Sequence, residues 1–226
     1  MSIAYGSVMP VMLNTDSPVW ILNLGADENR FSPAFLSVVD QALTAVTDSS
    51  EPIALMITAT GKFFSNGLDL EWLESNPGEW NKNVTSVQSL FARILTLEVP
   101  TVCAINGHCF AAGAMLALAC DYRVMRTGKG FISIPAVDIK IPLTRGMTSL
   151  IQSKLSPRSS LDVMTTGWRY DAPAALDAGI VDAICDAKEL TTVAQGMVAD
   201  LVGKDRKTLG AIKSLIYASV TNELTK

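Results

Sequence analysis

Apolar positions in the first part of the chain alternate between short continuous runs and helical stripes. Val19–Leu24 is an apolar run rich in strand formers, and Ser32 followed by Pro33 marks a helix start. The apolar positions that follow are three or four residues apart, as on one face of a helix: Leu36, Val39, Leu43 and Val46. Ile53–Thr58 is a second strand-like run. This order of strand, helix and strand predicts a mostly parallel sheet covered by helices.

The middle of the chain continues this order. Thr60–Asp69 contains turn residues and predicts a loop, and Asp69 is placed to cap a short helix over Leu70–Leu73. Glu74–Asn83 contains Asn-Pro-Gly, which predicts a long surface loop that covers a site. The spacing of apolar residues then predicts a helix that stops before Pro100: Val84, Val87, Phe91, Ile94 and Leu95.

The second half begins with two more buried elements. Thr101–Ile105 is predicted to be a strand, and Ala111–Ala119 a helix that is apolar nearly all round and therefore buried. Tyr122–Met125 is predicted to be a strand and Phe131–Lys140 an extended segment. From Pro142 the chain is predicted to be helical, in three main pieces: Asp171–Gly179 with a glycine stop, Ala194–Val202, and Leu209–Val220.

Composition narrows the class of protein. The chain has 226 residues, of which 49% are hydrophobic and 18% charged, with a net charge of −4. These values exclude a disordered chain and argue against a nucleic-acid partner. The most apolar stretch, Val102–Cys120, is interrupted between Asn106 and Gly113, so we expect no membrane span. The N-terminus has no basic or apolar leader segment, which predicts a cytoplasmic protein without a secretory signal.

The single histidine, His108, excludes several catalytic classes. A nucleophilic triad needs a histidine from elsewhere in the fold, and zinc sites need several histidines or paired cysteines, so we expect no metal. Gly107–Ala111 approaches a nucleophile elbow around Cys109, but the final glycine and a remote base are missing. The cysteines show no paired spacing and are expected to be reduced and mostly buried: Cys103, Cys109, Cys120 and Cys185.

Two loop-to-helix junctions are the strongest candidates for chemistry. Phe64–Asp69 and Asn106–Gly113 are each expected to follow a buried strand and to open a helix. The first N–H groups of a helix have no partner within it, and glycine lets a ligand approach the backbone closely. Two such N–H groups that converge would form an oxyanion hole for an enolate or a tetrahedral intermediate. Their spacing alone is also compatible with two ordinary turns.

The sequence around these junctions resembles the enoyl-CoA hydratase/isomerase (crotonase) superfamily. The similar segments are Lys62–Leu70, Val99–Arg123, Thr166 with Gly167, and Ala178–Val181. Further segments are most similar to the delta(3),delta(2)-enoyl-CoA isomerase branch: Asp27–Pro33, Phe63–Gly67 and Val137–Leu143. The resemblance covers Val19–Val181 and rests on two long ordered motifs.

This resemblance implies an α/β fold, a spiral of β-β-α units with a helical C-terminal region. Residues 1–185 would form the spiral core domain and residues 186–226 a helical segment for oligomerisation or cover. It further implies a homotrimer or a dimer of trimers, and an acyl-CoA or enoyl-CoA thioester as the substrate without any other cofactor. The thioester carbonyl would be held by the backbone N–H groups of Leu68 and Ala112.

Further substrate-binding residues follow from the resemblance. The CoA nucleotide would lie near Arg30 and the segment Ser65, Asn66, Gly67 and Asp69. Candidates for the wall of an apolar acyl tunnel are Phe64, Trp72, Met115 and Leu143. The alternative for Arg30 is a solvated loop charge, because exposed arginines are common. The alternative for the apolar side chains is plain core packing, where large apolar residues usually lie.

One departure from the family pattern concerns the catalytic carboxylates. Hydratases of the family use two glutamates, and Met115 stands at the first position, which argues against hydration. Isomerases use one glutamate, and alignment through Pro135 and Val137 places it at Ala136. Alanine cannot transfer the proton. Three accounts remain: a natural non-isomerase, a variant whose glutamate was replaced, or catalysis by Asp138.

The third account depends on the backbone. On an extended segment Asp138 and Ala136 would share a face about 6.6 Å apart. The resemblance implies an isomerase-type enzyme that shifts a 3-enoyl-CoA double bond to the 2-position through a dienolate, with Ala136 at the position of its catalytic glutamate. The alternatives are a non-catalytic acyl-CoA-binding protein, or a hydratase or thioesterase of the same family.

Overall fold

Within the described residues, a unit of strand, strand and helix occurs three times. The computed structural model describes residues 1–5 and 11–226. The first unit comprises β4 (Ala54–Thr58), β5 (Phe63–Ser65) and α2 (Leu70–Ser75). The second comprises β6 (Thr101–Ile105), β7 (His108–Phe110) and α4 (Ala112–Ala119). The third comprises β8 (Tyr122–Arg126), β9 (Ile132–Ser133) and α5 (Arg145–Lys154).

The two strands of each unit belong to different sheets. Within the described residues, the large sheet has the order β1-β2-β3-β4-β6-β8-β10 and the small sheet the order β5-β7-β9. The remaining strands of the large sheet are β1 (Ser2–Tyr5), β2 (Val11–Asn14), β3 (Val19–Asn23) and β10 (Ala183–Cys185). Pairing is parallel from β3 to β10 and antiparallel between β1, β2 and β3. The predicted α/β spiral of β-β-α units is confirmed.

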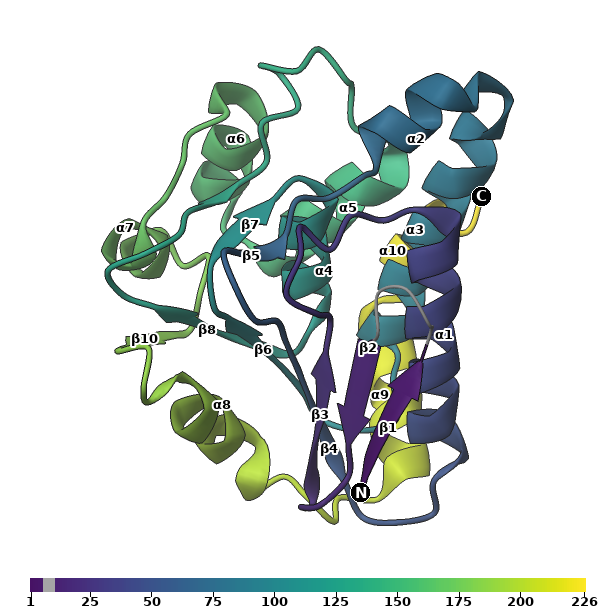
Figure 1. Cartoon of the computed structure of the whole chain (residues 1–226), viewed down its shortest axis with the longest axis vertical. Helices are drawn as coiled ribbons and strands as arrows, with labels where there is room; N and C mark the ends of the chain where they lie inside the picture. Colours follow the sequence, from purple (N-terminus) through teal and green to yellow (C-terminus); the bar gives the residue numbers. More distant parts are fainter. Residues whose placement is uncertain (6–10) are drawn as a thin grey trace.

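Helices cover both faces of the large sheet (Figure 1). One face packs against α1 (Pro33–Asp48), α3 (Trp80–Leu95) and α4, and its core includes Leu55, Ile57 and Cys103. The other face packs against α8 (Leu190–Ala199), and its core includes Met56 and Val102. Neighbouring strand residues point to opposite faces, so β4 and β6 supply both cores in alternation.

The helical C-terminal region encloses the spiral. It comprises α6 (Pro157–Thr166), α7 (Ala172–Asp177), α8, α9 (Arg206–Ile216) and α10 (Ala218–Leu224). The predicted stretch Leu209–Val220 is two helices, because the chain leaves helical geometry at Tyr217. Figure 1 shows α10 beside α3, and its Val220 and Leu224 belong to the larger core.

Three local predictions about helices are confirmed, two by their caps and one by burial. The side chain of Ser32 accepts a hydrogen bond from Phe35 N at the start of α1, and Pro33 lies in its first turn. Asp69 caps α2 in the same way through Trp72 N. All residues of α4 are buried, as its apolar sequence predicts.

Two predictions about the segments near the candidate site are wrong. Glu74–Asn83 is not a loop, since α2 is followed by a short 3-10 turn over Pro77–Glu79 and α3 begins at Trp80. Proline is well suited to a first helical turn, so the Asn-Pro-Gly sequence starts a turn here. Phe131–Lys140 is not extended beyond Ser133, because Asp138 N and Ile139 N both donate to Pro135 O, at 3.0 and 3.1 Å.

A largely buried ion pair joins α9 to the starts of β6 and β8. Lys213 is 5% exposed, and its Nζ donates to Asp121 Oδ2 at 2.6 Å and to Val99 O at 3.0 Å. Asp121 Oδ2 also accepts from Thr101 N at 2.8 Å. One carboxylate therefore joins the C-terminal region to the start of a central strand.

Replacing this lysine should destabilise the whole chain. Lys213→Ala leaves the Asp121 carboxylate, whose side chain is only 18% exposed, without its cation, and we expect a loss of about 3 kcal/mol in the free energy of unfolding. Urea denaturation measures it. Lys207→Ala, an exposed position on the same helix, should change stability by less than about 0.5 kcal/mol. Equal stabilities of the two variants would contradict the assignment.

Candidate active site

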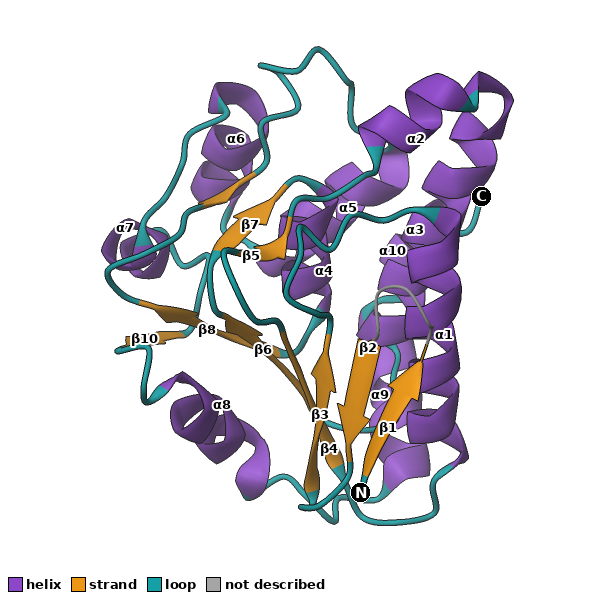
Figure 2. Cartoon of the chain, viewed as in Figure 1, coloured by secondary structure: helices purple, strands orange, loops and turns teal. Residues whose placement is uncertain are grey.

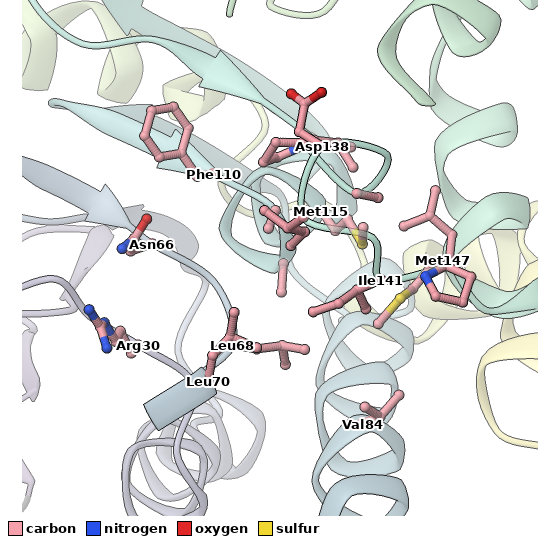
Figure 3. A pocket seen from close by; sticks show the side chains of 18 of the residues that line it. Arg30, Asn66, Leu68, Leu70, Val84, Phe110, Met115, Asp138, Ile141 and Met147 are labelled. Atoms are coloured by element: carbon pink, nitrogen blue, oxygen red, sulfur yellow. The ribbon is translucent and has the colours of Figure 1, made fainter. Parts of the chain in front are cut away.

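A cavity of about 680 Å³ lies where the small sheet meets α2, α3 and α5. Its wall is mostly apolar and includes Trp80, Val84, Met115, Ile141, Leu143 and Met147. The polar residues of the wall are Arg30, Asn66, Glu71, Asp138, Thr144 and Arg169. Figure 3 shows that these side chains come from several elements that are distant in sequence. A mostly apolar cavity with few polar groups is the usual form of a small-molecule site.

Two unpartnered backbone N–H groups belong to residues of this wall. Leu68 follows β5, and Ala112 is the first residue of α4. In the described part of the chain, neither N–H donates a hydrogen bond to a protein acceptor. The two junctions are in contact, because a Cβ added to Gly67 would lie 3.0 Å from Ala112 N. Two free donors on neighbouring segments can bind one ligand oxygen.

Buried hydrogen bonds fix the backbone on the Leu68 side. Asn29 Nδ2 donates to Phe64 O at 2.9 Å, and Ser65 Oγ donates to Asn29 O at 2.8 Å. Ser65 Oγ also accepts from Gly67 N at 3.1 Å, and Phe31 N donates to Gly67 O at 2.7 Å. Gly67 has a φ of 82°, in the region that favours glycine. These contacts orient the following peptide, which carries the Leu68 N–H.

The Ala112 side has a strained start. Ala111 has φ 50° and ψ −120°, a conformation that a residue with a Cβ rarely adopts. It is held there because Ala111 N donates to Ser133 O at 2.9 Å and Ala111 O accepts from Met115 N at 3.2 Å. Gly113 lets α4 approach β5, since a Cβ at that position would lie 2.7 Å from Ser65 Cβ. Figure 2 shows the small sheet against this end of α4.

The structure brings eight of the sequence-predicted site residues into the cavity wall. They are Arg30, Asn66, Leu68, Ala112, Met115, Ala136, Asp138 and Leu143. Four others do not line it: Phe64 and Ser65 are fully buried in the interior, Gly67 supports the turn, and Asp69 caps α2. Trp72 is also absent from the wall, and Trp80 of the next helix lies there instead.

Sequence reasoning missed several wall residues for a common reason. Phe63 lines the cavity in place of Phe64, because neighbouring residues of β5 point to opposite sides. Phe110 of β7 was missed likewise. The signal was the alternation of Phe63 and Phe64, which becomes informative only once Thr60–Asp69 is recognised as containing a strand. Arg169 and Glu71 carried no sequence signal of their own.

The wall offers little acid–base chemistry near the two free N–H groups. Ala136 and Met115, where the family resemblance places carboxylates, are apolar. Asp138 lies on a turn, and its carboxylate contacts the segment at Gly167, where an added Cβ would lie 2.2 Å from Oδ2. Figure 3 shows that carboxylate directed away from Met115. The premise that Asp138 shares an extended face with Ala136 is therefore wrong.

A charged network lies at one side of the opening. Arg30 Nε contacts Glu28 Oε2 at 2.6 Å, and Arg30 Nη1 contacts Glu71 Oε1 at 3.0 Å. Asn66 Nδ2 donates to Glu28 Oε2 at 2.9 Å. Hydrogen bonds from Asn66 and Arg30 lower the pKa of Glu28, and hydrogen bonds to Glu28 and Glu71 raise the pKa of Arg30. The network joins the loop before α1 to the start of α2.

The cysteines take no part in the cavity wall. Cys103, Cys109 and Cys120 are buried and Cys185 is partly buried, all as free thiols, so the expectation of mostly buried reduced cysteines is confirmed. Burial raises the pKa of the Cys103 and Cys109 thiols, which disfavours a nucleophilic thiolate. In residues 1–5 and 11–226 no group of three or more metal-ligating side chains is arranged to hold an ion, and no helix is long and apolar enough to cross a membrane.

Comparisons with known proteins agree on one family. The family model for enoyl-CoA hydratase/isomerase matches residues 21–226. Enoyl-CoA delta isomerase 1, peroxisomal, of Arabidopsis thaliana is 32% identical over 209 residues, which are 89% of this chain and 87% of that protein. Enoyl-CoA delta isomerase 2, peroxisomal, of the same organism is 33% identical over 219 residues, which are 91% and 90% of the two chains.

Solved structures show the same fold. Human mitochondrial delta3-delta2-enoyl-CoA isomerase superposes with a TM-score of 0.88 at 22% identity, over 95% of this chain and 85% of the other. An apo enoyl-CoA isomerase from Mycobacterium tuberculosis gives a TM-score of 0.88 at 22% identity, over 96% and 95% of the two chains. At these identities the similarity establishes the spiral fold.

The contact at Gly67 predicts a specific stability loss. Gly67→Ala places a Cβ 3.0 Å from Ala112 N and from Phe110 O, in addition to the strain of a positive φ. Gly128→Ala is the matched control, since Gly128 has φ 75° and open space around it. We expect Gly67→Ala to cost about 1–3 kcal/mol more than Gly128→Ala in urea denaturation. Equal losses would mean that the junctions are not in contact.

The strain at Ala111 predicts a stabilising substitution. Glycine adopts the observed φ of 50° without a steric cost, so Ala111→Gly should raise the free energy of unfolding by about 1 kcal/mol. Thermal denaturation measures the change. Ala114→Gly, in the interior of the same helix, should instead lower stability by about 1 kcal/mol, and a shared direction for both variants would refute the strain.

Proposed function

Since the chain belongs to the enoyl-CoA hydratase/isomerase family, we propose that its cavity binds an enoyl-CoA thioester in the manner of an isomerase-type enzyme. The observation that carries this proposal is the pair of unpartnered N–H groups of Leu68 and Ala112 on a mostly apolar cavity. The thioester carbonyl accepts both hydrogen bonds, and the acyl chain extends along the apolar wall. Coenzyme A enters as part of the substrate, and the chemistry uses no separate cofactor.

The reaction proposed is the shift of a 3-enoyl-CoA double bond to the 2-position. Loss of a proton from C2 produces a dienolate, whose negative charge collects on the thioester oxygen. Donors that already point at this oxygen stabilise the dienolate more than the substrate, which lowers the barrier. A base takes the proton from C2, holds it while the dienolate exists and returns it at C4, so that atoms and charge balance.

No described residue is well placed to carry the proton between C2 and C4. The family resemblance places the proton carrier at Ala136, whose methyl group accepts no proton. Asp138 is directed toward Gly167, and Glu71 is 81% exposed and paired with Arg30. We infer that the chain retains the binding and carbonyl-polarising parts of an isomerase, with proton transfer greatly slowed.

A second function is favoured by the same positions. Ala136 and Met115 leave the cavity without carboxylates beside the bound carbonyl, which suits a protein that binds acyl-CoA without converting it. A hydratase is disfavoured because Met115 cannot activate water. A thioesterase would be recognised by its product, since it would release CoA as a free thiol. A homotrimer and a cytoplasmic location remain predictions; the Arabidopsis relatives are named as peroxisomal and the human structure as mitochondrial.

Restoring a carboxylate at position 136 tests the proposed function. Ala136→Glu should raise the rate of conversion of 3-octenoyl-CoA to 2-octenoyl-CoA by about 10²–10⁴-fold, because a general base becomes available. Chromatography of the thioesters distinguishes this product from a 3-hydroxyacyl product and from free CoA. Ala136→Gln, of the same size without a base, is the control and should not gain activity.

The outcomes separate the candidate functions. Binding of octenoyl-CoA without isomerisation in either the original chain or Ala136→Glu would refute the isomerase and favour the acyl-CoA-binding protein. Activity of the original chain that disappears in Asp138→Asn would instead identify Asp138 as the base. Conversion by Ala136→Gln as fast as by Ala136→Glu would refute a role for the carboxylate.

A further inference from the structure

Asn83 of α3 is a buried polar side chain that the proposed reaction does not use. The residue is 2% exposed, and its Nδ2 donates to Phe31 O at 3.2 Å. Its Oδ1 is buried and, among the described residues, accepts no hydrogen bond. An unpaired buried oxygen costs free energy, which offsets the gain from the one hydrogen bond that the amide makes. The stability of the fold therefore gives little reason for an asparagine here instead of a leucine of similar volume.

Phe31 connects Asn83 to the turn that follows β5. It is fully buried and stands two residues before α1, a helix that lies beside α3 (Figure 1). Phe31 N donates to Gly67 O at 2.7 Å, and Phe31 pairs with Leu68 as an isolated parallel bridge. Two hydrogen bonds in series therefore join the Asn83 amide to the peptide group between Gly67 and Leu68.

That peptide group carries one of the two free N–H donors. It is trans and planar, so the C=O of Gly67 and the N–H of Leu68 point in opposite directions. A contact that fixes the Gly67 oxygen thus also fixes the direction of the Leu68 N–H. Within residues 1–5 and 11–226, the one donor to Gly67 O is Phe31 N. The direction of the Leu68 N–H consequently depends on where the backbone of Phe31 lies.

The backbone of Phe31 is held from two sides. Its ring stacks on that of Phe35 with the centroids 5.7 Å apart, which places the side chain. Its N–H is bound to Gly67 O, and its C=O is bound to Asn83 Nδ2. Without that amide the carbonyl end of Phe31 is free to tilt, and the N–H end and the Gly67 oxygen tilt with it.

We propose that Asn83 aims the Leu68 N–H at the ligand carbonyl by holding Phe31 against Gly67. The inference rests on the proposed function, in which that N–H binds the thioester oxygen. Asn83 is a positioning residue, because it is not part of the cavity wall and acts only through Phe31. The second donor, Ala112 N–H, belongs to α4 and is supported by the residue before that helix. Loss of the Asn83 amide therefore misdirects one donor of the two.

The carbonyl stretch of a bound thioester measures these two hydrogen bonds directly. Infrared difference spectra of octanoyl-CoA, isotope-labelled at the thioester carbon, should show a lower carbonyl frequency on the original chain than in solution. Asn83→Leu and Asn83→Ala both remove the Nδ2 donor and should each lose about half of this shift, since one of two donors is misdirected. Titration calorimetry should show octanoyl-CoA binding weakened by about 2–10-fold in both variants.

Two comparisons separate positioning from a general effect on the fold. Asn81→Leu makes the same change at an exposed position of the same helix and should keep the full carbonyl shift and the affinity. Asn83→Leu fills the space of the asparagine and Asn83→Ala leaves it empty, so Asn83→Ala should unfold at a lower urea concentration. Positioning requires that both lose the same part of the carbonyl shift in spite of that difference in stability.

The possible results are distinct. A full carbonyl shift in both Asn83 variants would overturn the inference. A shift that falls in proportion to the loss of stability would also overturn it, because that pattern marks a merely structural residue. An original chain that does not bind octanoyl-CoA, or binds it without lowering the carbonyl frequency, would instead overturn the proposed function itself.

Discussion

The contact between Gly67 and the first residues of α4 is the constraint on which the candidate site depends. The paired strands β5 and β7 bring the segments that follow them to the same edge of the small sheet. The backbones approach so closely there that a Cβ at position 67 would crowd the first residue of α4. The approach directs two peptide N–H groups at one cavity. The chemistry of the site thus depends on the absence of a side chain at position 67 more than on the presence of any polar residue.

Neighbouring features follow from that approach. Gly113 lets α4 lie against Ser65. Ala111, the residue directly before α4, has an unfavourable backbone conformation, which turns the chain into the helix at this point. Helix α4 is buried on all sides, and its N-terminal residue Ala112 lies on the mostly apolar wall of the cavity. A hydrogen bond is stronger in such surroundings, and the same surroundings make an unpaired N–H costly until a ligand arrives.

Much of the fold could be predicted from the sequence because its main elements carry local signals. The stripe of α1, the cap at Ser32 and the wholly apolar α4 are properties of contiguous residues, and the structure has all three. The strands β5 and β7 have three residues each and depend on pairing partners about 45 residues apart. A pattern that short has no reliable period, so Phe63 and Phe110 could not be assigned to the cavity side.

The missed turn after β9 has a similar cause. The segment from Pro135 to Lys140 contains proline and β-branched residues, which favour extended backbone locally. In the structure the carbonyl of Pro135 accepts two hydrogen bonds from within the segment, and no further strand is available to pair with it in the described residues. The position of Asp138 was therefore decided by the end of the small sheet, which the sequence did not reveal. Arg169 and Glu71 reach the cavity only through tertiary packing.

The two faces of the large sheet place different limits on sequence change. The smaller core, between the sheet and α8, contains Met56, Val102 and Leu190 and is separate from the cavity wall. The larger core contains Met115, Ile134 and Met147, which also line the cavity. Substitutions in the core on the α8 side thus affect folding without changing the cavity wall, whereas those in the larger core affect folding and ligand shape together. Over evolutionary time the α8 side should drift freely among apolar residues of equal volume, while the opposite side should change mainly when the ligand does.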